Sequence, residues 1–293
     1  MKYSEDTFNT WTKPLSETEK QRAENAIRMV RSAIDECEEL KQFDIEIFMQ
    51  GSYANNTNVR AESDVDVCVM RKDVFYYDLP QNQNYSSYGF CPTTSCAPDY
   101  RRFVKIALQR KFGFDAVTEG NKSLKVRENT YHIQADIIPA YQYRKYSETG
   151  NNSFIEGTGI IARDGRSIIN YPKIHITHGR EKNKRTSYIY KKLVRILKHV
   201  KNDMVDCGKA DSDKITSFLV ECLVWNVPDN VMVECEEWNE RVSGMLKYVF
   251  RSITNGNHKE WFEVSEMLNL FTGRKWTALD VNLWVLETML FLK

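Results

Sequence analysis

The chain has 293 residues, of which 42% are hydrophobic and 28% are charged, a balance typical of a folded globular protein. Its net charge of +1 lacks the basic excess with which proteins neutralise the phosphates of long nucleic acids, so we expect no stable complex with such a polymer. No apolar run reaches the roughly 18 residues of a membrane span, and the N-terminus has no signal-peptide core. We therefore expect a cytoplasmic protein with no membrane partner.

The first part, residues 1–170, is predicted to be a mixed α/β domain that includes an N-terminal helix. Ser16 and Glu19 form a capping-box pattern, and apolar residues then recur at helical spacing as far as residue 41. Downstream we expect strands at 44–50, 64–70, 123–127, 131–138 and 140–146, a surface loop at 80–98, a helix at 99–112, and loops around a hairpin at 150–165.

The second part, residues 171–293, is predicted to be helical, because the sequence pattern changes after Pro172. Helices are expected at 187–204, 214–226, 237–254, 259–271 and 279–293. The predicted fold class is therefore α+β, a mixed sheet with helices packed against a C-terminal helical bundle. We expect the two parts to form one bilobed unit with the active site in its cleft.

Two carboxylates lie two residues apart in a valine-rich run that contains Val65, Val67 and Val69. In a strand, Asp64 and Asp66 point to the same face, while the valines point to the core. Like charges this close repel each other, and a divalent cation can balance them. Mg²⁺ prefers oxygen ligands and leaves positions open for phosphate, so the pattern predicts a magnesium site, with Mn²⁺ as a substitute.

A third carboxylate, Asp136, alternates with Ile133, Ala135 and Ile137 and should project from the polar face of a later strand. If that strand neighbours the first, Asp64, Asp66 and Asp136 converge as the ligands of a two-metal catalytic site.

The turn at Gly51 and Ser52 fits phosphate binding. Glycine lets the backbone approach a phosphate closely, and the Ser52 hydroxyl and nearby N–H groups can donate hydrogen bonds to it.

At these residues the sequence resembles the polymerase-β-like nucleotidyltransferases, whose pattern is a strand, Gly-Ser, Asp-x-Asp on the next strand and a third Asp later. Within that superfamily it resembles the bacterial cGAS/DncV-like enzymes (CD-NTases). The stretch Asn170-Tyr171-Pro172, followed by His175, His178-Gly179 and Lys182-Asn183, is similar to their E clade.

The resemblance implies a nucleotidyltransferase core that makes cyclic di- or oligonucleotide messengers from nucleoside triphosphates in antiphage (CBASS) defence. A downstream effector protein would read the product. ATP and UTP are the implied substrates.

The resemblance also implies nucleotide contacts outside the carboxylates. It places a triphosphate-binding lysine near Lys198, in a basic stripe with Lys191 and Arg195 that otherwise suggests a solvated charged face. It matches Ser217 to a phosphate-contacting serine, and a helix N-terminus suits an anion. It places Asn170 against a base, where an amide can pair with O4 and N3–H of uracil; the alternative is that Asn170 only shapes the turn before Pro172.

Several alternatives are open from the residues. A linear oligonucleotide or RNA-tailing enzyme would share the carboxylates but usually carries a basic track. A glycosyltransferase with an Asp-x-Asp motif leaves Gly51, Ser52 and Asp136 without a role. A non-catalytic binding module would not need all three carboxylates. The seven cysteines favour free thiols; a zinc site would need Cys91 and Cys96 together with His175 and His178.

Overall fold

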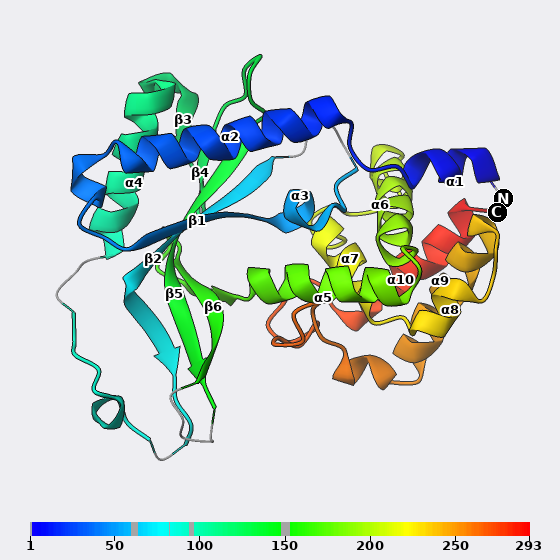
Figure 1. The fold of residues 1–293 in the computed structure, drawn as a ribbon. Helices are drawn as coiled ribbons and strands as arrows, with labels where there is room; N and C mark the ends of the chain where they lie inside the picture. The colour runs from blue at the N-terminus through cyan, green and yellow to red at the C-terminus, as the bar shows by residue number, and fades with distance from the viewer. Residues whose placement is uncertain (1, 60–63, 82, 94–96, 148–152) are drawn as a thin grey trace. The chain divides into compact units, whose positions relative to one another are not determined.

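A computed structural model describes residues 2–59, 64–81, 83–93, 97–147 and 153–293 (Figure 1). The chain divides into two compact units. The helical unit combines residues 1–15, 55–60 and 174–293, and the sheet unit combines 16–54 and 61–173. Residues 1–15 and 55–60, which the sequence boundary at 170 assigns to the α/β part, thus belong with the C-terminal helices.

The sheet unit contains one mixed sheet (Figure 1). Five strands lie in the order β1 (Ile45–Gln50), β2 (Val65–Asp78), β5 (Ala135–Tyr146), β4 (Leu124–Val126) and β3 (Val117–Glu119). A hairpin of β6 (Phe154–Ile161) and β7 (Ser167–Asn170) extends from β5 through β6. The pair β2–β5 is parallel, and the other pairs are antiparallel.

Two helices, α2 (Glu17–Asp35) and α4 (Ala97–Phe112), pack against each other and against one face of this sheet (Figure 1). The expected capping box is present, because Ser16 accepts from the N–H of Glu19 and the Glu19 carboxylate accepts from that of Ser16. Val65, Val67 and Val69 are buried in the core on this face, whereas Cys68 and Met70 belong to a smaller cluster on the other. The alternation predicted for β2 is therefore observed.

Strand β5 is continuous across Pro139, although the sequence suggested two strands separated there. On one side Pro139 pairs with Val69 of β2. On the other side, β4 pairs with residues 135–137 and β6 with residues 141–146, so residues 138–140 have no strand partner. Because no ladder hydrogen bond is required on that side, the missing N–H of proline does not interrupt the strand.

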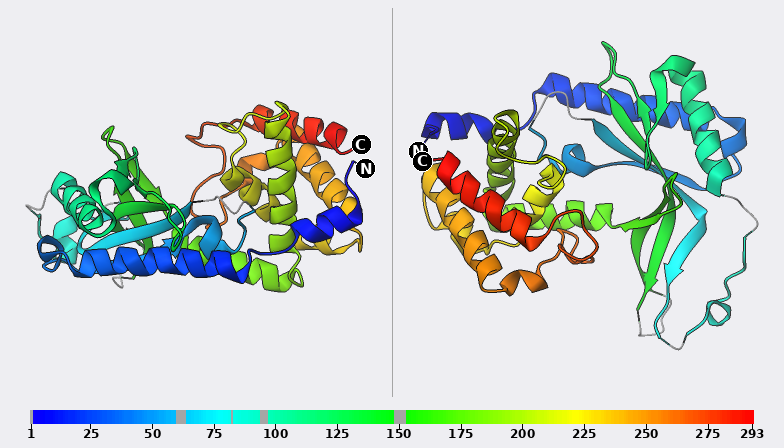
Figure 2. Two further views of the ribbon diagram at one scale, coloured as in Figure 1. Left: turned by 90° about the horizontal axis from the view of Figure 1, so that it is seen from above. Right: turned by 180° about the vertical axis from the view of Figure 1, so that it is seen from behind.

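The helical unit is built around α6 (Tyr190–Asp206), most of whose residues are buried. Its other helices include α1 (Glu5–Trp11), α5 (Pro172–Arg185, with Pro172 and Lys173 counted in the sheet unit), α7 (Ser217–Trp225), α8 (Asp229–Val233), α9 (Trp238–Thr254) and α10 (Ala278–Phe291). Both views in Figure 2 show α1 beside one end of α6. Phe8 of α1 is fully buried in the core of this unit, which explains why the N-terminal segment belongs to it.

The prediction of a helix at 259–271 is wrong. A short 3-10 helix, η4 (Asn257–Glu260), is followed by a bridge between Phe262 and Asn269. Glu266 has a φ of 59°, which a continuous helix does not allow. The remaining short elements are α3 (Gly51–Asn55), η1 (Glu38–Leu40), η2 (Tyr85–Tyr88) and η3 (Phe114–Ala116). Among the described residues, no helix is long and apolar enough to cross a membrane.

Candidate active site

Three carboxylates lie at the start of two neighbouring parallel strands of the sheet unit. Asp64 immediately precedes β2, and Asp66 and Asp136 are the second residues of β2 and β5. Asp66 and Asp136 are direct partners in the β2–β5 register. Because residues two apart share a face of a strand, all three side chains project from the face opposite the valine core.

Two side chains that were not singled out from the sequence contact these carboxylates. The Lys125 ammonium on β4 lies 3.6 Å from Oδ2 of Asp64 and 3.7 Å from Oδ1 of Asp136. Gln134 donates from Nε2 to Oδ1 of Asp64 at 2.8 Å. Lys125 could have been found by alternation, because Leu124 and Val126 point to the core and leave Lys125 on the same face as its partner Asp136.

The electrostatics of the cluster are unfavourable to full ionisation. Burial, followed by the charges of Asp136 and Asp64, raises the pKa of Asp66 to about 7, although Lys125 opposes the shift. Burial also raises the pKa of Asp136. Three carboxylates held together beside a single lysine therefore favour protonation or a bound cation.

The donor set fits a hard divalent cation. Oδ1 of Asp136 is buried and accepts no hydrogen bond from a described residue, and carboxylate oxygens are the ligands that Mg²⁺ prefers. In the described part of the chain, no three acidic, histidine or cysteine side chains already form a cage around one point. Lys125 occupies the position of the counter-charge in this structure.

The Gly51 turn lies directly against this cluster. Gly51 has a φ of +68°, and a Cβ added there would stand 2.1 Å from Oδ2 of Asp66. Only glycine therefore allows the first turn of α3 to approach the carboxylate this closely. Ser52 follows in the same turn and is partly exposed.

Lys198 lies in the helical unit and is almost entirely buried. Its ammonium donates to Oε2 of Glu221 at 2.7 Å and to Oγ1 of Thr57 at 3.1 Å. Thr57 donates to the same carboxylate, and His175 donates to its other oxygen at 3.1 Å. Burial alone would raise the pKa of Glu221, but Lys198 and His175 hold it well below its usual value.

This network shows a residue that the sequence analysis missed. Glu221 is the only charged residue of α7, whose other residues are mostly apolar, and such a lone acid signals a buried ion pair. Two of the three N–H donors of Lys198 are engaged within the unit.

The expectation that Lys191 and Arg195 form a solvated face is wrong, because both are buried. Arg195 donates to the backbone oxygens of Thr12 and Asn56, which replace its hydration. Burial lowers the pKa of Arg195 to about 10 and that of Lys191 to about 8. The sequence pattern could not show this, because Thr12 and Asn56 lie far from α6 along the chain.

Ser217 is the first residue of α7, and Thr216 caps that helix by accepting from the N–H of Leu219 at 3.1 Å. The Ser217 side chain is partly exposed at the positive end of the helix dipole.

Asn170 ends β7 in the sheet unit, opposite Thr158 of β6. Its side chain is partly exposed, and its backbone oxygen accepts from the Thr158 hydroxyl at 3.4 Å. A Cβ on Gly157 would lie 2.8 Å from the backbone oxygen of Asn170, so glycine permits the close pairing of β6 with β7.

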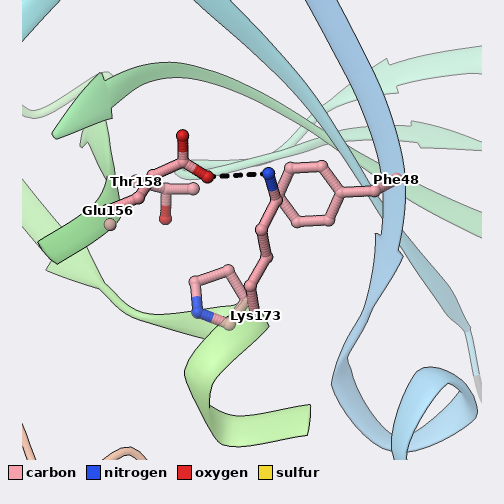
Figure 3. Close-up of a pocket in the computed structure, with 6 residues that line it drawn as sticks. Phe48, Glu156, Thr158 and Lys173 are labelled. Atoms are coloured by element: carbon pink, nitrogen blue, oxygen red, sulfur yellow. Dashed lines mark hydrogen bonds and ion pairs between the residues drawn. The ribbon is translucent and has the colours of Figure 1, made fainter. Parts of the chain in front are cut away.

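A hollow beside this strand pair is lined by Phe48, Glu156, Gly157, Thr158, Pro172 and Lys173 (Figure 3). The Lys173 ammonium donates to Glu46 at 2.6 Å and to Glu156 at 2.7 Å, and it lies 5.0 Å from the Phe48 ring centre. Because two carboxylates neutralise Lys173, this lysine anchors the start of α5 rather than offering a free charge to phosphate.

The alternative zinc site is not assembled among the described residues: His175 bonds to Glu221, His178 bonds to the Val264 oxygen, and Cys96 lies outside the described residues. The six described cysteines are free thiols.

Comparison with known proteins places the chain in a family. Residues 30–113 match the nucleotidyltransferase domain, and residues 177–293 match the C-terminal helical domain of the cGAS/DncV-like nucleotidyltransferases. The cyclic dipyrimidine nucleotide synthase CdnE of Cecembia lonarensis is 44% identical over 283 residues, which cover 96% of this chain and 95% of that protein. The chain is an E-clade CD-NTase.

Solved structures of CdnE enzymes share the whole fold. The Rhodothermus marinus CdnE c-UMP-AMP synthase, bound to Apcpp and Upnpp, matches with a TM-score of 0.87 and 28% identity, over 98% of this chain and 95% of that one. Elizabethkingia meningoseptica CdnE, bound to GTP and Apcpp, matches with a TM-score of 0.82 and 29% identity, over 99% of each chain. The expected family, α+β fold and nucleotidyltransferase class are confirmed, which excludes a glycosyltransferase and a non-catalytic binding module.

The raised pKa of Asp66 predicts that the metal-free CD-NTase loses stability as the pH rises. An aspartate in an unfolded chain has a pKa of about 3.9, so Asp66 binds its proton more tightly in the folded state. Its contribution to stability is complete below pH 4 and is lost as the pH rises through about 7. In EDTA, Asp66→Asn should therefore have a higher Tm than wild type at pH 8, and the difference should shrink as the pH falls to 5.

Asp78→Asn, at the far end of β2, is the matched control and should follow wild type. A gap between wild type and Asp66→Asn that stays constant from pH 5 to pH 8 would contradict the assigned electrostatics.

Lys198 should contribute to stability through Glu221. Lys198→Ala leaves a buried carboxylate without its cation, which typically costs about 3–5 kcal/mol. Combining Lys198→Met with Glu221→Gln removes both charges and should recover most of that loss in urea unfolding. Lys247→Ala, at an exposed position of α9, should change the free energy of unfolding by less than about 0.5 kcal/mol. Equal stability of Lys198→Ala and wild type would show that the ion pair is not formed.

Proposed function

We propose that this CD-NTase makes a cyclic dinucleotide from nucleoside triphosphates, with Asp64, Asp66 and Asp136 as the metal ligands and uridine as one of the incorporated nucleosides. The observation that carries the proposal is the pairing of Asp66 with Asp136 in the parallel β2–β5 register, with Asp64 alongside.

The chain's own residues have defined tasks in this proposal. The three aspartates would hold the cation through their anionic oxygens, and Lys125 would leave Asp64 and Asp136 to make room for it. Bound Mg²⁺ would activate the attacking hydroxyl and neutralise the triphosphate and the leaving pyrophosphate. Gly51 brings the first turn of α3 against Asp66, so that its N–H groups and the Ser52 hydroxyl can donate to a phosphate.

Two successive transfers of the same kind give a cyclic product. In each, a ribose hydroxyl gives its proton to water, its oxygen forms a bond to an α-phosphorus, the bond from that phosphorus to the oxygen it shares with the β-phosphate breaks, and pyrophosphate leaves with the electron pair. The first transfer joins two nucleotides, and the second joins the ends of the linear product. The relatives that are named as cyclic nucleotide synthases support cyclisation over tailing.

The choice of uridine is proposed from Asn170 together with the relatives. Its amide offers a donor and an acceptor side by side, which uracil can match with O4 and N3–H. The Cecembia relative is named as a cyclic dipyrimidine synthase and the Rhodothermus relative as a cyclic UMP-AMP synthase. We propose UTP and ATP as the substrates and an effector protein of antiphage signalling as the reader of the product.

The carboxylates should be essential for synthesis. With all four triphosphates and Mg²⁺ or Mn²⁺, Asp64→Asn, Asp66→Asn and Asp136→Ala should each lose roughly 1,000-fold in rate, because several kcal/mol of charge stabilisation is removed. Mass spectrometry identifies the product, and resistance to phosphatase separates cyclic from linear forms. Asp78→Asn is the control. Wild-type turnover in any of the three variants, measured on folded protein, would refute the assignment.

Ser217 is proposed to donate a hydrogen bond to a phosphate group, which every nucleoside triphosphate carries. Ser217→Ala should raise KM about 10-fold for each substrate without changing the product, because a hydrogen bond to a charged group is lost. Thr216→Ala removes the α7 cap and should lower stability by about 1 kcal/mol with less effect on KM. A shift in product identity with unchanged KM would contradict the phosphate role.

Asn170 is proposed to select the base. Asn170→Ser should shift incorporation from UTP toward purine triphosphates while total turnover with purines is retained, because a single hydroxyl cannot make both contacts with uracil. Ser167→Ala, at the other end of β7, is the control. A wild-type product that contains only adenosine and guanosine would rule out uridine use but would leave the carboxylate assignment intact.

A further inference from the structure

Helix α10 of the helical unit carries a stripe of exposed leucines. Leu279 is 66% exposed, Leu283 53%, Leu286 38% and Leu290 63%. Their spacings of four, three and four residues place them in one line along the helix, since residues three and four apart are neighbours on its surface. A contiguous apolar line of this kind, rather than scattered single residues, marks an interaction surface.

The opposite side of the same helix is already packed. Val281, Trp284, Val285, Thr288 and Phe291 are buried, and α10 contacts α6 and α9. In the rear view of Figure 2, α10 runs unobstructed along the helical unit. The helix is therefore apolar on both sides, a composition expected of a helix that is covered all round. Among the described residues, those that cover α10 lie on its inner side.

The spacing of the stripe is self-complementary. The four leucines are symmetric about a point between residues 284 and 285, so a two-fold axis there sets Leu283 opposite Leu286 of a second copy and Leu279 opposite Leu290. Leucines of the two helices would thus meet in successive layers, as in an antiparallel coiled coil. A two-fold interface of this kind uses the same surface on both partners. We propose that the leucine stripe binds the leucine stripe of a second copy, with the two α10 helices antiparallel.

Charges beside the stripe agree with this orientation. Asp280 and Glu287 border it on one side, and Asn282 and Met289 border it on the other. An antiparallel pair brings like sides together, so Glu287 of one copy lies beside Asp280 of the other. Asp280 is bound at 2.7 Å by Lys214, whose side chain is half exposed. The lysine neutralises Asp280 and offers its ammonium to the opposing Glu287, which makes this rim attractive.

The experiment is sedimentation velocity of the full chain over roughly 1–100 μM, the range in which a modest apolar interface associates. Wild type should shift from monomer to dimer, while Leu283→Lys and Leu286→Glu should each stay monomeric, with unchanged circular dichroism because these side chains are exposed. Val233→Lys, at a 43% exposed position of α8, is the matched control and should dimerise like wild type. A wild-type monomer over the whole range would overturn the proposal, as would an equal loss in the control.

Mixing variants tests the orientation. An equimolar mixture of Leu283→Lys and Leu286→Glu should regain a dimer, because the introduced ammonium and carboxylate face each other across the two-fold while the other pair keeps its leucines. A mixture of Leu283→Lys and Leu283→Glu should stay monomeric. The reverse result would show parallel helices and overturn the arrangement proposed here.

Discussion

The parallel pairing of β2 with β5 is the constraint on which the candidate site depends. It is a backbone interaction, yet it sets Asp66 beside Asp136 against their mutual repulsion and fixes the face from which they project. The valines of β2 stabilise the opposite face, because any slip of one residue would expose them and bury the carboxylates. Core packing thus holds together charges that would otherwise separate. The raised pKa of Asp66 reflects the unfavourable free energy of ionising it in this cluster.

The helical unit solves a different electrostatic problem. Its central helix buries Lys191, Arg195 and Lys198, and side chains or carbonyls from other segments of the chain hold Arg195 and Lys198. Arg195 donates to the carbonyl oxygens of Thr12 and Asn56, and Lys198 donates to the Glu221 carboxylate. These bonds hold the N-terminal segment and residues 55–58 within the unit, which is why it is assembled from three stretches of chain.

Local periodicity was sufficient for much of this structure. Alternation in β2 and β5 predicted which way Asp64, Asp66 and Asp136 point, and the capping box predicted the start of α2. Failures occurred where distant contacts decide the outcome. Pro139 lies in a strand because its neighbouring strands leave a gap there. Residues 259–271 fold back through a bridge rather than a helix, and the Phe262 backbone is held by the side chain of Asn226, 36 residues away. The burial of Arg195 depends on Thr12, 183 residues away, which no window of sequence can reveal.

The discontinuous makeup of the two units has a consequence for recombination between related enzymes. A crossover at residues 173–174 follows the boundary between the two units in the later part of the chain. It would, however, separate Phe8 from the helical core in which it is buried, and Thr57 from the Glu221 carboxylate to which it donates. A chimera joined there would combine one parent's helices with the other parent's α1 and 55–60 segment. Productive shuffling should therefore exchange residues 1–15, 55–60 and 174–293 as one inherited block, and substitutions at Phe8 or Thr57 should covary with positions in α6 and α7.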